Sequence, residues 1–150
     1  MARIAIASDH AAIELKVLLA AWLQERGHAL VDLGAHDDAP VDYPDYGFAI
    51  ADALADGRAD LGVALCGSGI GIAIAANRHP DCRCALVSEP LSARFARTHN
   101  DANCIAMGAR MIGPEMAKAC LDAFLSADFL GGRHAARVAK LTHPVTKEPA

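Results

Sequence analysis

The sequence predicts a single-domain, doubly wound (Rossmann-like) α/β/α sandwich with a five-stranded parallel sheet. Short, almost continuously apolar segments alternate five times with segments of helical periodicity. Strands of this kind are typical of a parallel sheet that is covered on both faces. The chain has 150 residues, the length of one domain, and 53% of them are hydrophobic while only 5% are aromatic. This alanine-rich composition favours helices packed closely on a sheet over a β-sandwich.

The elements follow one another in a regular order along the chain. The expected strands span residues 3–8, 28–33, 60–65, 83–87 and 103–107. The expected helices span residues 11–26, 44–56, 70–77, 89–99, 114–127 and 133–140. The first helix shows an apolar stripe of Ile13, Val17, Leu18, Leu19, Trp22 and Leu23 and is closed by Gly27.

Proline and glycine mark several of the later boundaries. Pro44 and Pro114 suit the first turn of a helix, and Gly131-Gly132 interrupts the chain before the last helix. We expect one domain over residues 1–140 and a loosely held polar tail over residues 141–150.

Charge and hydropathy exclude two classes of partner. The formal net charge is −4 and no basic run exceeds two residues, so a continuous basic face for nucleic acid is not expected. The apolar stretches have the length of strands and are too short for a membrane span. The N-terminus enters a strand directly, without a signal-peptide pattern, and this predicts a cytoplasmic protein.

Five cysteines are present, without a C-x-x-C pair, so neither a redox motif nor a zinc site is indicated. Cys82, Cys84, Cys104 and Cys120 are interpreted as small residues of a buried sheet or helix. Cys66 differs because it directly precedes the turn Gly67-Ser68-Gly69-Ile70-Gly71.

This glycine turn follows a predicted strand and opens a predicted helix. Closely spaced glycines allow the backbone to approach a ligand and leave N–H groups that attract a phosphate or a developing oxyanion. A cysteine at such a junction is placed to act as a thiolate. The alternative is a turn made only for close packing, with Cys66 as a small buried residue.

Three familiar motifs are excluded at this turn. A dinucleotide fingerprint follows the first strand as G-x-G-x-x-G, but here that strand ends in Ser8-Asp9-His10. A P-loop requires Gly-Lys-Ser/Thr, which is absent. A cysteine phosphatase would carry an arginine six residues after its nucleophile, where this chain has Ile72.

Further polar groups follow other predicted elements. Asp9-His10 and Gly108–Arg110 lie at strand ends, where ligands bind in such folds. Arg133 and Arg137 lie one helical turn apart and suit a phosphate, although an isolated pair is more often a solvated face. His99, near the end of a helix, suits either a residue that interacts with the helix dipole or a general acid.

An ordered set of motifs over about residues 3–140 resembles the ribose-5-phosphate isomerase B family, which also includes galactose-6-phosphate isomerase subunits and allose-6-phosphate isomerases. The matching segments are Ser8-Asp9-His10-Ala11, Asp42-Tyr43-Pro44, Cys66-Gly67-Ser68-Gly69-Ile70-Gly71, Ala75-Ala76-Asn77, Ser88-Glu89-Pro90, His99-Asn100-Asp101 and Gly131-Gly132-Arg133-His134-x-x-Arg137-Val138. Ser68 departs modestly from the family, in which many members have threonine, but the hydroxyl is kept.

The resemblance implies an aldose–ketose isomerase of the pentose phosphate pathway that interconverts ribose 5-phosphate and ribulose 5-phosphate. It implies Cys66 as the base, His99 as the group that assists ring opening, and Ser68 as a proton relay. Positions implied to contact the substrate are Asp9, His10, Tyr43, Gly67, Ser68, Gly69, Ile70, Gly71, Asn100, Arg110, Arg133 and Arg137, with the two last as the phosphate clamp.

The resemblance also implies a homodimer, assembled further in some cases, whose active sites are built from both chains without a metal or organic cofactor. Two alternatives stay open at this point. One is an isomerase of a six-carbon sugar phosphate, allose 6-phosphate or galactose 6-phosphate, admitted by the loop over residues 34–42. The other is a non-catalytic sugar-phosphate-binding protein, which would not need Cys66.

Overall fold

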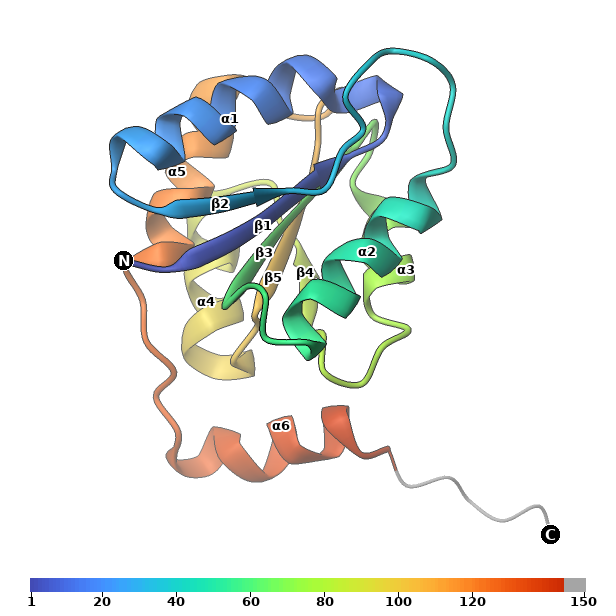
Figure 1. The fold of residues 1–150 in the computed structure, drawn as a ribbon. Coiled ribbons are helices and arrows are strands. Elements are labelled where there is room, and N and C mark those ends of the chain that lie inside the picture. The colour runs from blue at the N-terminus through green and yellow to red at the C-terminus, as the bar shows by residue number, and fades with distance from the viewer. Residues whose placement is uncertain (145–150) are drawn as a thin grey trace, which may run out of the picture.

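The computed structural model describes residues 1–144 as a five-stranded parallel sheet covered on both faces by helices (Figure 1). The strands are β1 (Arg3–Ser8), β2 (Ala29–Asp32), β3 (Leu61–Cys66), β4 (Cys84–Leu86) and β5 (Cys104–Gly108). Their order across the sheet is β2-β1-β3-β5-β4, and every neighbouring pair is parallel. The predicted doubly wound fold is therefore confirmed.

Six α-helices accompany the strands within the described part of the chain. They are α1 (Ile13–Glu25), α2 (Tyr43–Ala55), α3 (Ile70–Ala76), α4 (Pro90–Asn100), α5 (Pro114–Leu125) and α6 (Ala135–Thr142). Short 3-10 turns over His10–Ala12 and Gly132–His134 precede α1 and α6. No helix among residues 1–144 is both long enough and apolar enough to cross a membrane.

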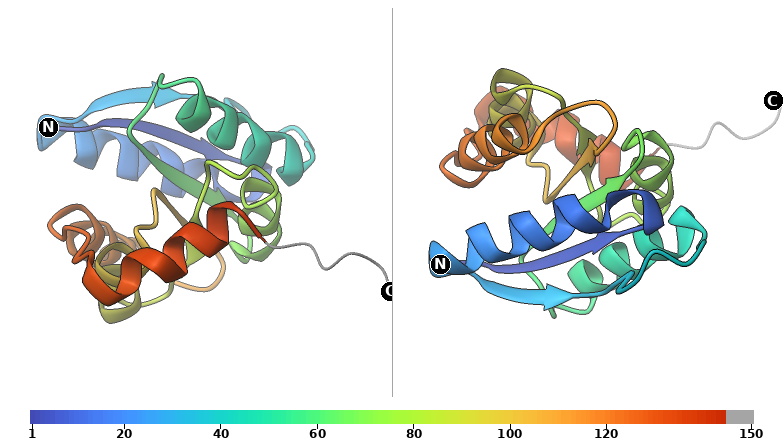
Figure 2. Two further views of the ribbon diagram at one scale, coloured as in Figure 1. Left: turned by 90° about the horizontal axis from the view of Figure 1, so that it is seen from below. Right: turned by 90° about the horizontal axis from the view of Figure 1, so that it is seen from above.

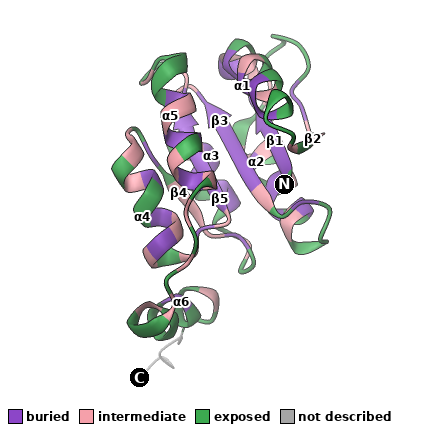
Figure 3. Cartoon of the chain, turned by 90° about the vertical axis from the view of Figure 1, so that its left-hand side faces the viewer, coloured by how far each residue is buried: buried purple, intermediate pink, exposed green. Residues whose placement is uncertain are grey.

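Successive strand residues point to opposite faces of the sheet. In this sheet the side chains on the two faces differ in size. Large residues such as Ile6, Leu65 and Met107 pack against α1, α4 and α5. Small residues such as Ala64 and Ala106 pack against α2 and α3. Figure 3 shows the central strands as the most completely buried part of the molecule.

The alanine-rich face lets α2 approach the sheet closely. A Cβ atom added at Gly62 of β3 would lie 2.7 Å from Cγ2 of Ile50. That separation is far inside the normal carbon–carbon distance of about 3.5 Å. The low aromatic content of the sequence is thus matched by a thin layer between the sheet and α2.

The first helix buries Leu19, Trp22 and Leu23 of the predicted stripe but not the whole stripe. Val17, which the apolar stripe placed inside, is 61% exposed, whereas the neighbouring Lys16 is 2% exposed. Nζ of Lys16 donates a hydrogen bond of 2.6 Å to Oδ1 of Asp32 at the end of β2. A buried cation is tolerated because this carboxylate pairs with it.

The last helix, α6 (Ala135–Thr142), agrees with the span 133–140 expected from the sequence to within two residues at each end. This helix lies across the edge of the sheet at which the strands begin, below the two helical layers (Figures 1 and 2). Residues 145–150 of the predicted tail lie outside the described residues.

Candidate active site

A cavity of about 530 Å³ opens at the edge of the sheet where β1, β3 and β5 end. The predicted site residues that line it are Asp9, His10, Tyr43, Cys66, Gly67, Ser68, Ile70, Gly71 and Arg110. The expectation that the three strand ends converge at one edge is therefore confirmed. Gly69 is buried beneath the turn and does not line the cavity.

Cys66 is the last residue of β3, and its side chain is 4% exposed. The backbone N–H of Gly69 donates to its Sγ atom at 3.1 Å. A donor in this position stabilises negative charge on sulfur. The turn therefore folds back on its own cysteine and holds the thiol at the floor of the cavity.

Two glycines of the turn, Gly69 and Gly71, are required by its geometry. Gly69 has a φ of +77°, in the left-handed region that favours glycine. A Cβ atom at Gly71 would lie 2.4 Å from the ring of Tyr43. Tyr43 begins α2, so this contact joins the turn to a second element of the cavity.

Two hydroxyl or amide contacts organise the rest of the turn. Oγ of Ser68 accepts a hydrogen bond of 3.2 Å from the N–H of Ile70. The N–H of Arg110 donates to the carbonyl of Gly67 at 2.9 Å, and the Arg110 guanidinium lies against Gly67. This backbone hydrogen bond joins the loops after β3 and β5. The side chain of Arg110 is exposed and lines the cavity.

The Asp9-His10 pair is held by backbone contacts. Oδ1 of Asp9 accepts from the N–H of Ala11 at 3.0 Å and caps the short helical turn after β1. The N–H of Val41 donates to Nδ1 of His10 at 3.1 Å. This bond leaves the proton of a neutral imidazole on Nε2, which can then donate to a ligand.

The contact from Val41 is absent from the sequence-based prediction. Its donor is a backbone amide, which any residue except proline provides, so the side chain at this position gives no signal.

Two of the remaining thiols, those of Cys104 and Cys120, are not suited to act as bases. Hydrogen bonds with Cys82 and Cys84, together with complete burial, hold the pKa of Cys104 well above its ordinary value. Burial, with a smaller contribution from the charge of Glu89, raises the pKa of Cys120 to about 11. Cys82, Cys104 and Cys120 are buried as expected, whereas Cys84 is only half-buried.

A second group of predicted site residues lies elsewhere in the same chain. The ring of His99 stacks between those of Phe95 and His134, with centroids 4.6 and 4.5 Å apart. Desolvation in this stack, with the charges of His99, Arg133 and Arg137, lowers the pKa of His134. Both arginines are exposed, and neither forms an ion pair within residues 1–144.

This second group lies at the opposite edge of the sheet from Cys66. Cys66 pairs with Gly108 at the end of β5, whereas His99 and Asn100 end the helix that precedes β5. The five residues from Cys104 to Gly108 are separated by four steps along the strand and span about 13 Å. None of His99, Asn100, Arg133 and Arg137 lines the Cys66 cavity.

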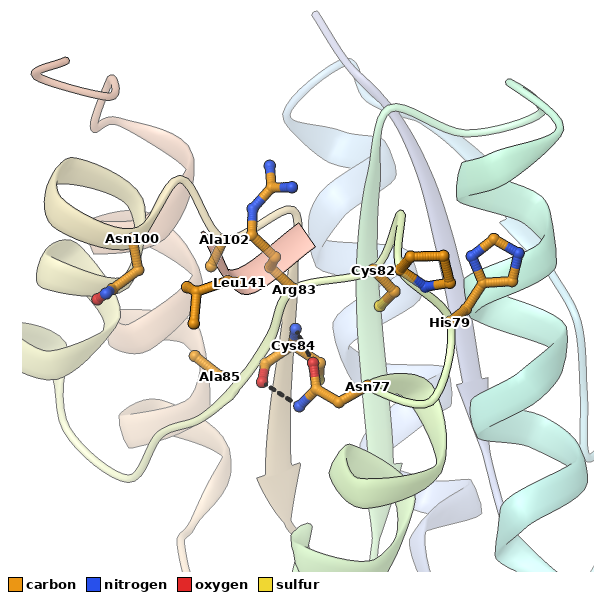
Figure 4. Close-up of a pocket in the computed structure, with 10 residues that line it drawn as sticks. Asn77, His79, Cys82, Arg83, Cys84, Ala85, Asn100, Ala102 and Leu141 are labelled. Carbon is orange, nitrogen blue, oxygen red and sulfur yellow. Dashed lines mark hydrogen bonds between the residues drawn. The ribbon is translucent and has the colours of Figure 1, made fainter. Parts of the chain in front are cut away.

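Asn100 instead borders a separate cavity of about 390 Å³, with Arg83 and Cys84 at the start of β4 and Leu141 of α6 (Figure 4). The predicted site residues of one chain therefore fall into two separate groups, which we call half-sites. One has the thiol and the glycine turn, and the other has a histidine stack with two arginines that form no ion pair among residues 1–144.

Metal-binding geometry is absent from the described residues. Among residues 1–144, no group of three or more histidine, cysteine, aspartate or glutamate side chains is arranged to hold a metal ion.

Comparisons with known proteins agree on one family. The family model described as Ribose/Galactose Isomerase matches residues 4–141. Ribose-5-phosphate isomerase B of Escherichia coli K12 is 44% identical over 142 residues, which cover 95% of each chain. D-erythrulose-4-phosphate isomerase of Pectobacterium atrosepticum is 42% identical over 143 residues, covering 94% of this chain and 93% of that protein.

Solved structures give the same result. The ribose-5-phosphate isomerase B of Clostridium thermocellum superimposes with a TM-score of 0.92 at 44% identity, covering 93% of this chain and 95% of that one. The enzyme of Thermotoga maritima also gives 0.92, at 45% identity, with coverage of 94% and 97%. The chain belongs to the ribose/galactose isomerase family.

Proposed function

We propose that this protein is an aldose–ketose isomerase that interconverts ribose 5-phosphate and ribulose 5-phosphate through an enediolate. The observation that carries the proposal is the Cys66 thiol at the floor of a cavity, directed at the space in front of a turn rich in backbone amides. Relatives named ribose-5-phosphate isomerase B share 44% of the sequence, and this supports the same substrate class here.

The reaction begins with the furanose form of the sugar. His99 donates a proton to the ring oxygen, the C1 hydroxyl gives its own proton to a solvent water, and the bond between C1 and the ring oxygen breaks. This role suits an imidazole, whose pKa lies close to neutral pH. The product of the step is the open-chain aldehyde.

Proton transfer between the carbons follows. The Cys66 thiolate removes the proton from C2, and the electron pair moves onto the C1 carbonyl oxygen to give the enediolate. Amides of the turn from Gly67 to Gly71 that are not already bonded to Cys66 or Ser68 stabilise the negative oxygen. The loss of one such donor from an enzyme's oxyanion hole costs about 3 kcal/mol. Cys66 then returns the proton to C1, while Ser68 moves a proton between O2 and O1.

The phosphate end holds the substrate in place. Arg133 and Arg137 offer permanently charged, forked donors, and Nε2 of His10 is free to donate as well. Binding energy from this remote group fixes the reacting carbons relative to the thiol.

We further propose a homodimer in which a second copy completes each site. The two half-sites lie at opposite edges of the sheet, so His99 and Cys66 of the same chain are too far apart to act on one substrate. Exposed apolar side chains adjoin both half-sites: Ile70 and Ile74, 52% and 62% exposed, border the Cys66 cavity, and Phe95, 43% exposed, stacks on His99. Such patches are typical of protein interfaces.

A substrate panel tests the activity. Turnover is measured with ribose 5-phosphate, allose 6-phosphate, galactose 6-phosphate and, because one relative is named for it, erythrulose 4-phosphate. We expect the highest kcat/KM with ribose 5-phosphate. A preference for a six-carbon sugar would replace the substrate assignment, and no turnover of any member would favour a binding protein.

A location in the cytoplasm stays a prediction.

The base is tested with two cysteine variants. Cys66→Ala is expected to abolish isomerisation and to leave substrate binding nearly intact. Cys120→Ala is the matched control, because its thiol is held protonated within the core. In D2O the wild type is expected to incorporate deuterium at the exchanged carbon. Unchanged turnover by Cys66→Ala would refute the assignment of the base.

A further inference from the structure

The last turn of α4, which carries His99, ends in an unusual backbone conformation. Asp101 follows Asn100 with φ 46° and ψ 42°, and it is the one non-glycine residue with positive φ among residues 1–144. A residue with a Cβ atom adopts this left-handed conformation when its surroundings hold it there. Contacts around Asp101 therefore hold the end of α4 in this conformation.

Two arginines grip the Asp101 carboxylate from different sides. Oδ2 lies 3.1 Å from Nη2 of Arg83, and Oδ1 lies 3.0 Å from Nη1 of Arg97. The side chains of Arg83, Arg97 and Asp101 are 20%, 18% and 32% exposed, so the cluster is shielded from water on most sides. Charge-assisted bonds of this kind are stronger than neutral ones.

The same guanidinium groups also bind the backbone around Asp101. Nε of Arg83 donates to the Asp101 carbonyl at 2.8 Å, and Nη1 of Arg97 donates to the Ala102 carbonyl at 2.7 Å. The amides of Asp101 and Ala102 donate back to the carbonyls of Arg97 and Ala96. The residue after the helix is thus fixed through its main chain and its side chain together.

Arg83 extends the cluster to α6. Its Nη1 atom reaches Oγ1 of Thr142 at 3.5 Å, and its own backbone N–H donates to Oδ1 of Asn103 at 2.7 Å. In Figure 4, Arg83 lies beside the cavity bordered by Asn100 from the end of α4 and by Leu141 from α6. The cluster therefore connects the element that carries His99 to the helix that carries Arg137.

His99 needs this connection, because its ring is held between two different elements. Phe95 on one side belongs to α4, and His134 on the other side precedes α6. The stacking is kept only while the end of α4 and the start of α6 hold their separation. We propose that Asp101, held by Arg83 and Arg97, is a positioning residue that sets the orientation of His99 for ring opening. This inference rests on the role of His99 in the proposed function.

Two substitutions separate the charge of Asp101 from its backbone conformation. Asp101→Gly keeps the left-handed conformation without steric cost and removes both ion pairs. Asp101→Asn tolerates the same conformation and keeps one oxygen acceptor. Asp60→Asn is the control, since it weakens the bidentate Arg3–Asp60 pair, an arginine–carboxylate contact at a site outside both half-sites.

A displacement of about 1 Å in a catalytic group can cost about 100-fold in rate. We expect Asp101→Gly to lower kcat on ribose 5-phosphate by about 10-fold to 100-fold, Asp101→Asn to lose less, and Asp60→Asn to keep the wild-type kcat. In a His99→Asn background, Asp101→Gly is expected to change kcat by less than about twofold. A wild-type kcat for Asp101→Gly, or an equal loss in both backgrounds, would overturn the proposal.

A spectroscopic measurement keeps this test independent of the activity. Ring currents from Phe95 and His134 displace the NMR signals of the His99 ring protons, which are assigned by their loss in His99→Asn. Asp101→Gly is expected to move these signals toward the values of an unstacked histidine, and Asp60→Asn is expected to leave them in place. Unmoved signals in Asp101→Gly would refute the positioning role even if ribose 5-phosphate proved not to be the substrate.

Discussion

Gly71→Ala is expected to damage the site through one contact, the one with Tyr43. The new Cβ atom would lie 2.4 Å from the tyrosine ring, about 1 Å inside the normal carbon–carbon separation of about 3.5 Å. Tyr43 is 43% exposed, so its ring can move outward by this distance of about 1 Å without disturbing the core. A loss of catalysis with little loss of stability is therefore expected.

The size of the effect follows from this displacement. Moving a substrate-contacting group by about 1 Å costs up to about 100-fold in rate, equivalent to about 2.7 kcal/mol in transition-state binding. We expect kcat/KM for ribose 5-phosphate to fall between 10-fold and 100-fold, with the melting temperature nearly unchanged. Steady-state assays and thermal unfolding monitored by circular dichroism measure the two quantities.

A double-mutant cycle identifies the cause. In a Tyr43→Ala background no ring opposes the new Cβ atom, so Gly71→Ala is expected to have little additional effect. Gly113→Ala is the matched control, because a Cβ atom at Gly113 would meet nothing within 4 Å. If Gly71→Ala kept full activity, or lost as much in the Tyr43→Ala background, the contact would not explain the requirement for glycine.

Two further predictions concern stability. Asp32→Asn is expected to lower the free energy of unfolding by about 3 kcal/mol because it leaves the buried Lys16 cation unpaired, whereas Lys16→Met is expected to be nearly neutral. Urea unfolding compares the two variants, and equal losses of stability would contradict the reasoning. The pKa of His134 is lower in the folded chain than its ordinary value of 6.5, so the unfolded chain binds a proton at a higher pH than the folded chain does. The free energy of unfolding is therefore expected to decline as the pH falls below 6.5. His134→Asn is expected to flatten that decline, and an unchanged pH profile would argue against it.

Much of the fold could be predicted from local patterns. Continuous apolar segments identify the parallel strands because both faces of this sheet are covered, and the strand ends then place Asp9, Cys66 and Arg110 at one edge. The details that could not be predicted depend on contacts between distant segments. Lys16 is buried because Asp32 of β2 lies beside it, and helical periodicity carries no information about that partner.

The separation of His99 from Cys66 within one chain is a second feature that local patterns do not reveal. His99 and Cys66 each have a suitable chemical type, but a helix end and a strand end in a parallel fold lie at opposite edges of the sheet. The clamp on Asp101 is only half local: Arg97 lies four residues earlier on the same helix, whereas Arg83 comes from another segment and carries no sequence signal.

Complementation between two impaired variants tests the central claim, that the thiol of one copy works with the histidine and arginines of another. Cys66→Ala and His99→Asn are each prepared alone and then mixed under conditions that exchange subunits. Random pairing gives about a quarter of all sites an intact thiol half and an intact histidine half. The account predicts that the activity of the mixture rises above that of either variant to about a quarter of the wild-type activity. A mixture no more active than the two variants measured alone, with mixed dimers confirmed by mass spectrometry, would contradict it.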